Sequence, residues 1–168
     1  MAFSFRRRIR RSNGRVIVKI DEQERELLEH LLPQLRDVLV GVAPSGELDP
    51  AIVRLFPTAH PEDVEAEATY QETQRDRLLA ARLDRLDTVE ATLQEESLDD
   101  EQHAAWIATI NDMRLVLGTR LDVGEEDEPL DFESDDPATA ALATYHYLGH
   151  LLGELVEAVD AGPFDPDR

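Results

Sequence analysis

The stretch AAWIATINDMRLVLGTRLDV, residues 104–123, decides the fold because it combines a long apolar helical pattern with polar residues at its centre. At about 100° per residue, its large apolar side chains share one arc of a helix. These side chains are Trp106, Ile110, Met113, Leu117 and Leu121. An arc of this size must be buried against other elements. The stretch therefore predicts a helix that packs into the core of a helical domain.

Three polar residues interrupt this pattern, and helical spacing separates them. Arg114 falls inside the apolar arc, and Asn111 borders the arc on the side of Gly118. Asp112 points to the opposite side, which we expect to face solvent. A buried arginine needs a carboxylate or carbonyl partner, because burying its charge unpaired is costly. We expect Arg114 with Asn111 to tie two helices together. A docking site for a partner's acidic group and a catalytic role are the alternatives.

The first twenty residues predict a basic β-hairpin. The β-rich segments FSFRRRI and RVIVKI flank Asn13-Gly14, a pair that accepts the positive φ angles of a tight turn. Arg6, Arg8 and Arg10 share one face of the first strand. These arginines have three interpretations: pairing with the protein's own acidic residues, contact with an acidic partner or second subunit, and contact with nucleic acid.

Residues 21–95 contain the first two principal helices. Asp21 and Glu24 form the capping-box pattern at the start of the first helix. Pro33 lies inside this helix and is expected to kink it or divide it. The segment PAIVRLF predicts a short helix ended by Pro57, and a longer, mostly polar helix follows.

The rest of the chain completes one domain over residues 1–168. It contains the motif helix at 98–122, an acidic connector at 124–136 and a C-terminal helix at 137–160. The last helix is expected to bury Leu142, Tyr145, Leu148, Leu152, Leu155 and Val159. The fold class predicted is mainly α, a single-domain bundle of about four principal helices with an N-terminal β-hairpin.

Charge and cysteine content exclude several functions. The net charge is −20, and seven of the 17 basic residues lie within the first twenty residues, which hold no acid. Such an acidic body repels phosphate backbones, so we expect nucleic-acid contact only through the hairpin. The chain has no cysteine, which excludes disulfides, thiol catalysis and thiol redox sensing. Neither a secretory signal nor a run of about 18 apolar residues is present. We expect a cytoplasmic protein without membrane contact.

The C-terminal helix contains a weak candidate metal site. His146, His150 and Glu154 follow the spacing H-x₃-H-x₃-E, which aligns them on one helix face. Two histidines at this spacing bind zinc only if a further ligand converges with them. A solvated polar face is the favoured interpretation, and we predict no metal and no other cofactor. Gly149 and Gly153 would allow close helix approach, within the chain or across a homodimer.

The motif helix also carries a resemblance. The residues W-I-x-x-I-N-D-M-R-L-x-L-G-x-R-L-D-V, 106–123, resemble the most recognisable motif of the actinobacterial oxidative-stress response regulator (AosR-like) family, formerly a domain of unknown function. RVIVKIDEQERELLEHLLPQL, DPAIVRLFPTAHPED and YHYLGHLLGELV are similar to other parts of that family, in the same order. The resemblance implies a small cytoplasmic protein without established enzymatic activity that contacts the transcription machinery, such as a sigma factor. Because this chain has no cysteine, a thiol switch cannot operate in it.

These observations favour a non-enzymatic regulatory or protein-interaction protein, acting on transcription through a sigma factor or RNA polymerase in a stress response. Two alternatives come from other classes. One is direct nucleic-acid binding through the basic hairpin. The other is a metal-dependent enzyme that uses His146 and His150.

Overall fold

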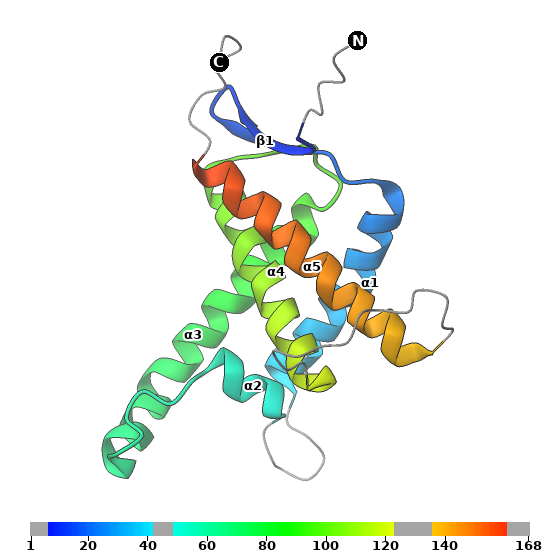
Figure 1. Cartoon of the computed structure of the whole chain (residues 1–168). Helices are drawn as coiled ribbons and strands as arrows, with labels where there is room; N and C mark the ends of the chain where they lie inside the picture. Colours follow the sequence, from blue (N-terminus) through cyan, green and yellow to red (C-terminus); the bar gives the residue numbers. More distant parts are fainter. Residues whose placement is uncertain (1–6, 42–48, 123–135, 161–168) are drawn as a thin grey trace, which may run out of the picture.

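The computed structural model of the protein describes residues 7–41, 49–122 and 136–160. Its elements in chain order are β1 (Ile9–Ser12), β2 (Arg15–Val18), α1 (Glu22–Val40), α2 (Pro50–Leu55), α3 (Val64–Thr92), β3 (Ser97–Leu98), α4 (Asp100–Leu121) and α5 (Pro137–Asp160). They form one helical domain with a small sheet at one end (Figure 1), as the sequence predicts. Arg6 and the predicted acidic connector, apart from Asp136, lie outside the described residues.

The sheet is antiparallel with the strand order β1-β2-β3. Asn13 and Gly14 connect the first two strands with φ angles of 51° and 75°, the left-handed values that a two-residue hairpin turn requires. Val16 and Val18 of β2 are fully buried, so one face of the hairpin packs on the helices. The third strand was not predicted, because two residues are too few to show a strand pattern.

The first helix begins as the capping pattern indicates. Asp21 accepts a hydrogen bond from the Glu24 amide, and the Glu24 carboxylate accepts one from the Asp21 amide, both at 2.9 Å. Pro33 does not divide α1, which continues to Val40. Its buried residues are Leu28, Leu32, Leu35, Val38 and Leu39. Through these side chains α1 packs against α3 and α4.

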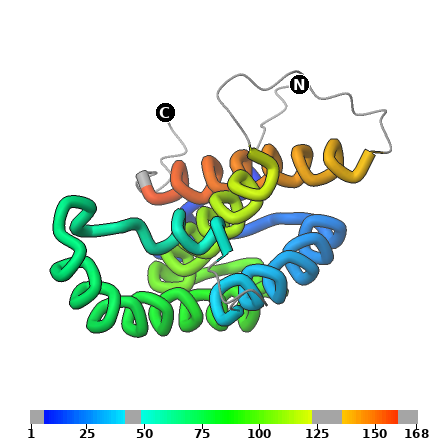
Figure 2. The backbone as a smooth tube through the Cα atoms, turned by 90° about the horizontal axis from the view of Figure 1, so that it is seen from below, coloured from blue at the N-terminus to red at the C-terminus, as the bar shows by residue number. Residues whose placement is uncertain are grey.

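The motif helix α4 lies at the centre of the domain. It packs against α1, α2, α3 and α5, and Figure 2 shows it between α5 and α3. Trp106, Ile110 and Met113 are buried as predicted, whereas Leu117 and Leu121 are half-buried. The buried residues of α4 span about half of the helix circumference, a wider arc than the predicted one, because α3 also covers the side that contains Asp112. The expectation that the side with Asp112 faces solvent was therefore wrong.

The C-terminal helix α5 lies at the edge of the domain, against α4 and β1. Leu148 and Leu155 are buried as predicted, together with Leu151 and Ala158. Val159 is 52% exposed, which contradicts its predicted place in the core. The side of α5 that faces the core is thus rotated from the predicted stripe. Within the described residues, no helix has the length and apolar content needed to cross a membrane.

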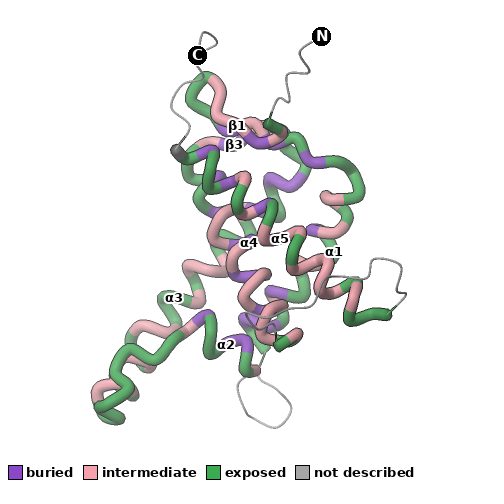
Figure 3. Tube along the Cα trace, in the orientation of Figure 1, coloured by how far each residue is buried: buried purple, intermediate pink, exposed green. Residues whose placement is uncertain are grey.

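The longest helix, α3, leaves much of its length uncovered. No residue from Pro57 to Arg85 is buried, and the first buried residue of α3 is Leu86. The end of α3 near Val64 extends beyond the rest of the domain, as Figures 1 and 3 show. We call residues 57–78, the segment after α2 with the first half of α3, the α3 arm. The core thus anchors α3 by its C-terminal part only.

Candidate functional site

The motif residue Asp112 is part of a buried ion pair. Asp112 lies on α4 and is 4% exposed, and its Oδ1 atom accepts a hydrogen bond from Arg82 Nη1 of α3. The Nη2 atom of Arg82 donates to the Leu55 carbonyl at 2.7 Å, so one arginine joins α2, α3 and α4. Burial raises the pKa of Asp112, and the Arg82 guanidinium opposes that shift. The prediction that Asp112 faces solvent was wrong, because α3 covers this side of α4.

The single tryptophan anchors the same helix. Trp106 is fully buried, and its Nε1 donates to Thr92 Oγ1 of α3 at 2.9 Å. The Thr92 hydroxyl in turn donates to the Thr88 carbonyl at 2.7 Å. A buried indole N–H is costly to leave unpaired, so this contact fixes the position of α4 against α3. Trp106 is therefore a core residue in this structure.

Arg114 has a different partner from the one expected. Its guanidinium carbon lies 4.7 Å from the centre of the Tyr145 ring on α5. Its Nε atom is buried and has no hydrogen-bond partner among the described residues, half-buried Asn111 included. The expected carboxylate or carbonyl partner is thus replaced by an aromatic ring. A cation over a ring face is attracted by the ring's electrons, but the ring does not satisfy the N–H group.

Two glycines make room for this stacked pair. A Cβ atom on Gly118 would lie 2.9 Å from Tyr145 Cε2, and one on Gly149 would lie 3.1 Å from Arg114 Nε. Both distances are shorter than ordinary van der Waals contact. The motif residues Arg114 and Gly118 therefore work together: the glycine admits the ring, and the ring supports the arginine.

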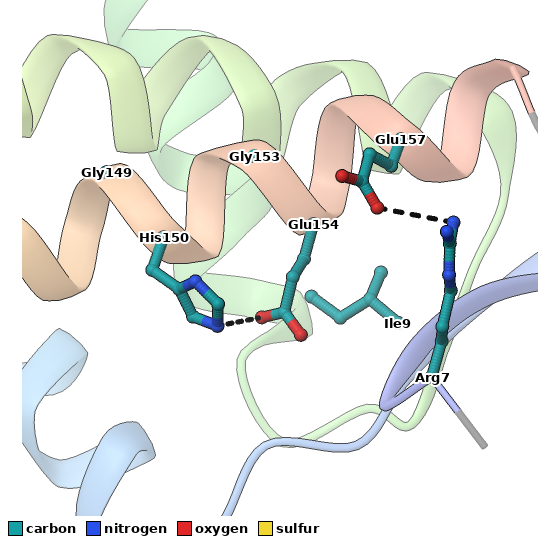
Figure 4. Close-up of a pocket in the computed structure, with 7 residues that line it drawn as sticks. All are labelled: Arg7, Ile9, Gly149, His150, Gly153, Glu154 and Glu157. Atoms are coloured by element: carbon teal, nitrogen blue, oxygen red, sulfur yellow. Dashed lines mark ion pairs between the residues drawn. The ribbon is translucent and has the colours of Figure 1, made fainter. Parts of the chain in front are cut away.

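Two open hollows border the outer side of α5. The first, of about 360 Å³, is drawn in Figure 4 and is lined by Arg7, Ile9, Gly149, His150, Gly153, Glu154 and Glu157. The second, of about 600 Å³, is lined by Arg114, Tyr145, His146, Gly149, Leu152, Gly153, Val156 and Glu157. The two hollows share the glycines and Glu157. Between them they leave the outer face of α5 accessible to another molecule.

The weak metal candidates do not converge on a single point. His150 Nε2 lies 3.8 Å from Glu154 Oε2, but Arg8 holds the same carboxylate. No group of three or more His, Asp or Glu side chains suited to a metal occurs among the described residues. His146 and His150 are exposed. The two histidines thus lie on an exposed polar face, and Glu154 contacts both Arg8 and His150.

The hairpin arginines contact the acidic body of the protein. Arg8 Nε donates to both carboxylate oxygens of Glu154, at 2.9 and 2.8 Å, and its Nη1 donates to Glu24. These two carboxylates raise the pKa of Arg8 above its ordinary value. Arg7 pairs with Glu157 at 3.2 Å and Arg11 with Asp100 at 2.7 Å. For Arg8, the interpretation as an intramolecular partner is the one that the structure supports.

The hydrogen-bonded residues of the α3 arm hold its two parts together. Glu67 Oε2 accepts from the amides of Ala59 and His60, at 3.0 and 2.7 Å, and its Oε1 accepts from Gln71 at 2.6 Å. The Gln71 amide and these backbone amides lower the pKa of Glu67. The rings of His60 and Tyr70 meet edge to face at 5.9 Å. The segment after α2 is therefore fixed along the start of α3.

Some of these residues had a signal in the sequence and others did not. Arg82 falls on the apolar stripe of the helix that contains Leu79, Leu86 and Val89, which indicates a buried arginine in need of a partner. The pairing of Arg8 with Glu154 joins residues 146 positions apart, and no local pattern predicts it. The polar residues 62–77 predict a mostly solvent-facing start of the helix, and no residue of the arm is buried.

Comparison with known proteins gives one match. The model of a family described as Domain of unknown function (DUF2017) matches residues 6–159. No curated protein matches the chain, and no solved structure matches it.

Proposed function

The chain belongs to the DUF2017 family of domains of unknown function, and on this premise we propose that it is a non-enzymatic regulatory protein that acts by binding another protein. The partner in this proposal is a component of the transcription machinery, a sigma factor or RNA polymerase, in a stress response. The resemblance of residues 106–123 to the AosR-like family supports this choice of partner. Because the chain has no cysteine, the stress signal must reach it by a route other than thiol oxidation.

The observation that carries the proposal is the exposed α3 arm. Val64 is 86% exposed and Leu78 is 40% exposed, and the domain core covers neither. A helix that extends from a domain without burying its own residues contributes little to the domain's stability through burial. Amphipathic helices recognise partners by laying such apolar side chains into a groove. The arm thus has the exposed apolar anchors that a partner-binding helix requires.

The charge of the arm indicates the kind of partner. Residues 57–78 contain six acidic residues and two arginines. Proteins that bind nucleic acid have clustered lysine and arginine on their surfaces. An acidic arm is complementary to such a surface, and complementary charge speeds association and selects among partners. The acidic arm therefore supports a partner from the transcription machinery.

The two alternative functions have less support. Arg8 and Arg11 of the hairpin are engaged by carboxylates of the same chain, so phosphate contact would require them to exchange partners. Glu154, the third residue of the metal candidate, is held by Arg8. Both features favour a structural role for residues that nucleic-acid binding or metal catalysis would use.

The experiment is an affinity capture from stressed and unstressed cells with the full chain as bait, followed by mass spectrometry. We expect the wild-type protein to recover a sigma factor or RNA polymerase subunits. The variant E72K/D76K reverses two exposed charges of the arm and should lose them. The variant E26K/E101K reverses two exposed charges on α1 and α4 and is the matched control, because it changes net charge equally.

The proposal is wrong if the wild-type bait recovers no transcription component under either condition. Equal recovery by E72K/D76K and E26K/E101K would show that the arm is not the binding element.

A further inference from the structure

The outward face of α5 is a continuous strip of small, apolar and charged residues. At about 100° per residue, Gly149, Gly153, Val156 and Glu157 fall on the side opposite the buried Leu151 and Leu155. Val156 is 45% exposed, and the 62% exposed Glu157 side chain is engaged only by the exposed Arg7 among the described residues. The larger hollow runs along one side of this strip.

No contact among the described residues requires glycine at position 153. A Cβ atom built on it meets nothing within 4 Å, so alanine or a larger residue would fit. Glycine in a helix interior is destabilising relative to alanine because the unfolded chain gains freedom. Gly149 differs, because a Cβ atom there would crowd Arg114. An exposed helical glycine with open space above it is suited to close approach by a second backbone.

Arg114 adds a requirement for an acceptor at the same face. Its guanidinium lines the larger hollow beside Gly149, and its buried Nε has no hydrogen-bond partner among the described residues. A carboxylate entering the hollow would bring the opposite charge to the guanidinium that lines it. Glu157 of the same helix is two turns away from Gly149, about 12 Å along the axis, too far to serve within one chain.

We propose that this face binds a second copy of the chain, with the two α5 helices antiparallel and crossing at Gly153. Gly149 and Glu157 each lie four residues from Gly153, so an antiparallel crossing there places Gly149 of one chain opposite the partner's Glu157. The carboxylate of the partner's Glu157 then meets Arg114, and the symmetry of the dimer repeats the contact. Leu152 and Val156 supply the apolar contact around the glycines.

Charge selects this arrangement over its alternatives. A parallel dimer with the same crossing would bring Glu157 next to the partner's Glu157, and like charges repel. A different partner would have to present a carboxylate and apolar groups at matching positions, which the second copy already does. Since each chain has a net charge of −20, salt should favour the dimer by screening the long-range repulsion between the two chains, while it weakens the close, partly buried Arg114–Glu157 contacts less. This inference does not rest on the proposed function, because α5 and α3 lie on opposite sides of α4 (Figure 2).

The test is sedimentation velocity of the full chain over a range of concentrations at 150 mM salt. We expect the wild-type chain to form a species of twice its 19.0 kDa mass. R114E and E157R should each raise the dimer Kd by at least about tenfold. An equimolar mixture of R114E with E157R should regain the dimer, because both contacts of the mixed dimer then join opposite charges. One contact joins the introduced Glu at position 114 to the introduced Arg at position 157, and the other joins native Arg114 to native Glu157.

Two further variants separate the proposal from loss of folding. G153L should abolish the dimer while keeping the helical circular dichroism of the wild type, because the site is open in the monomer. R7A removes the intramolecular partner of Glu157 and should leave the dimer intact. A wild-type chain that stays monomeric at all concentrations overturns the proposal. So does a dimer that G153L and E157R leave unchanged.

Discussion

Arg82 of α3 and Asp112 of α4 form an ion pair inside the helical body, and the same arginine donates to the backbone of α2. The carboxylate is 6% exposed and the arginine side chain 21% exposed, so water screens the pair only in part. Three helices therefore depend on one guanidinium. Arg36 of α1 pairs with Asp87 and Glu90 of α3 at 2.6 and 2.7 Å, but these carboxylates are more exposed.

Removing the Asp112 carboxylate should destabilise the protein. D112A leaves Arg82 without its buried counter-charge, which costs several kcal/mol in fully buried pairs and here about 1–3 kcal/mol, because Arg82 can still reach water. R36A, at a more exposed ion pair, should cost less than about 1 kcal/mol. Urea unfolding followed by circular dichroism measures both. A D112A protein as stable as the wild type would show that the pair contributes nothing.

The Arg8 contacts should hold the hairpin on the helices. R8A removes a guanidinium that joins the residue before β1 to α1 through Glu24 and to α5 through Glu154, and we expect a loss of about 1–3 kcal/mol in the free energy of unfolding. R7A is the matched variant, since Arg7 and Glu157 are both more than half exposed. Hydrogen exchange should rise in residues 9–18 of R8A and stay unchanged in R7A. Equal exchange in the two variants would contradict this role.

The contribution of the Trp106–Thr92 hydrogen bond to stability can be measured with substitutions of Thr92. T92V removes the acceptor and leaves the buried indole N–H unpaired, with an expected cost of about 1–2 kcal/mol. T92S keeps the hydroxyl and should lose less. Because the chain has one tryptophan, its fluorescence reports this site during unfolding. The prediction fails if T92S loses as much stability as T92V.

Acid should destabilise the fold through His103. This side chain is 2% exposed, and its Nε2 donates to the Leu155 carbonyl at 2.9 Å. Burial lowers the pKa of His103 below its ordinary value of 6.5; the hydrogen bond to Leu155 and the charge of Asp100 oppose this shift, and Arg11 adds to it. The unfolded state thus binds the proton more readily, so the stability is fully present above pH 6.5 and is lost as pH falls through the lower folded pKa. In H103Q, the slope of unfolding free energy between pH 7 and 5.5 should be smaller.

Local signals in the sequence predicted much of the fold. Asp21 with Glu24, and the Asn13-Gly14 turn, act through neighbouring residues, so their positions could be read from the chain. Asp112 could not be placed, because the burial of its side of α4 depends on α3, which lies far away in sequence. The predicted burial of Val159 was wrong for the same reason, because an apolar side chain is compatible with either side of a helix until the neighbouring elements are known.

The candidate binding surfaces were harder to predict than the helices, because they depend on contacts between elements far apart in the sequence. Arg114 was predicted inside the apolar arc with a carboxylate or carbonyl partner, but it is half-buried and its ring partner Tyr145 comes from α5. The exposure of Val64 agrees with the predicted solvent-facing stretch of residues 62–77, whereas that of Leu78 depends on where the burial of α3 begins, at Leu86. Helical spacing shows which residues share a face, but it does not show what covers that face.

The most direct test of the central claim, that the α3 arm binds the transcription machinery, is biolayer interferometry between the immobilised full chain and purified RNA polymerase holoenzyme. We expect saturable binding by the wild type and by E26K/E101K, and loss of binding by E72K/D76K. No binding of polymerase by the wild type, or equal binding by all three proteins, would contradict it.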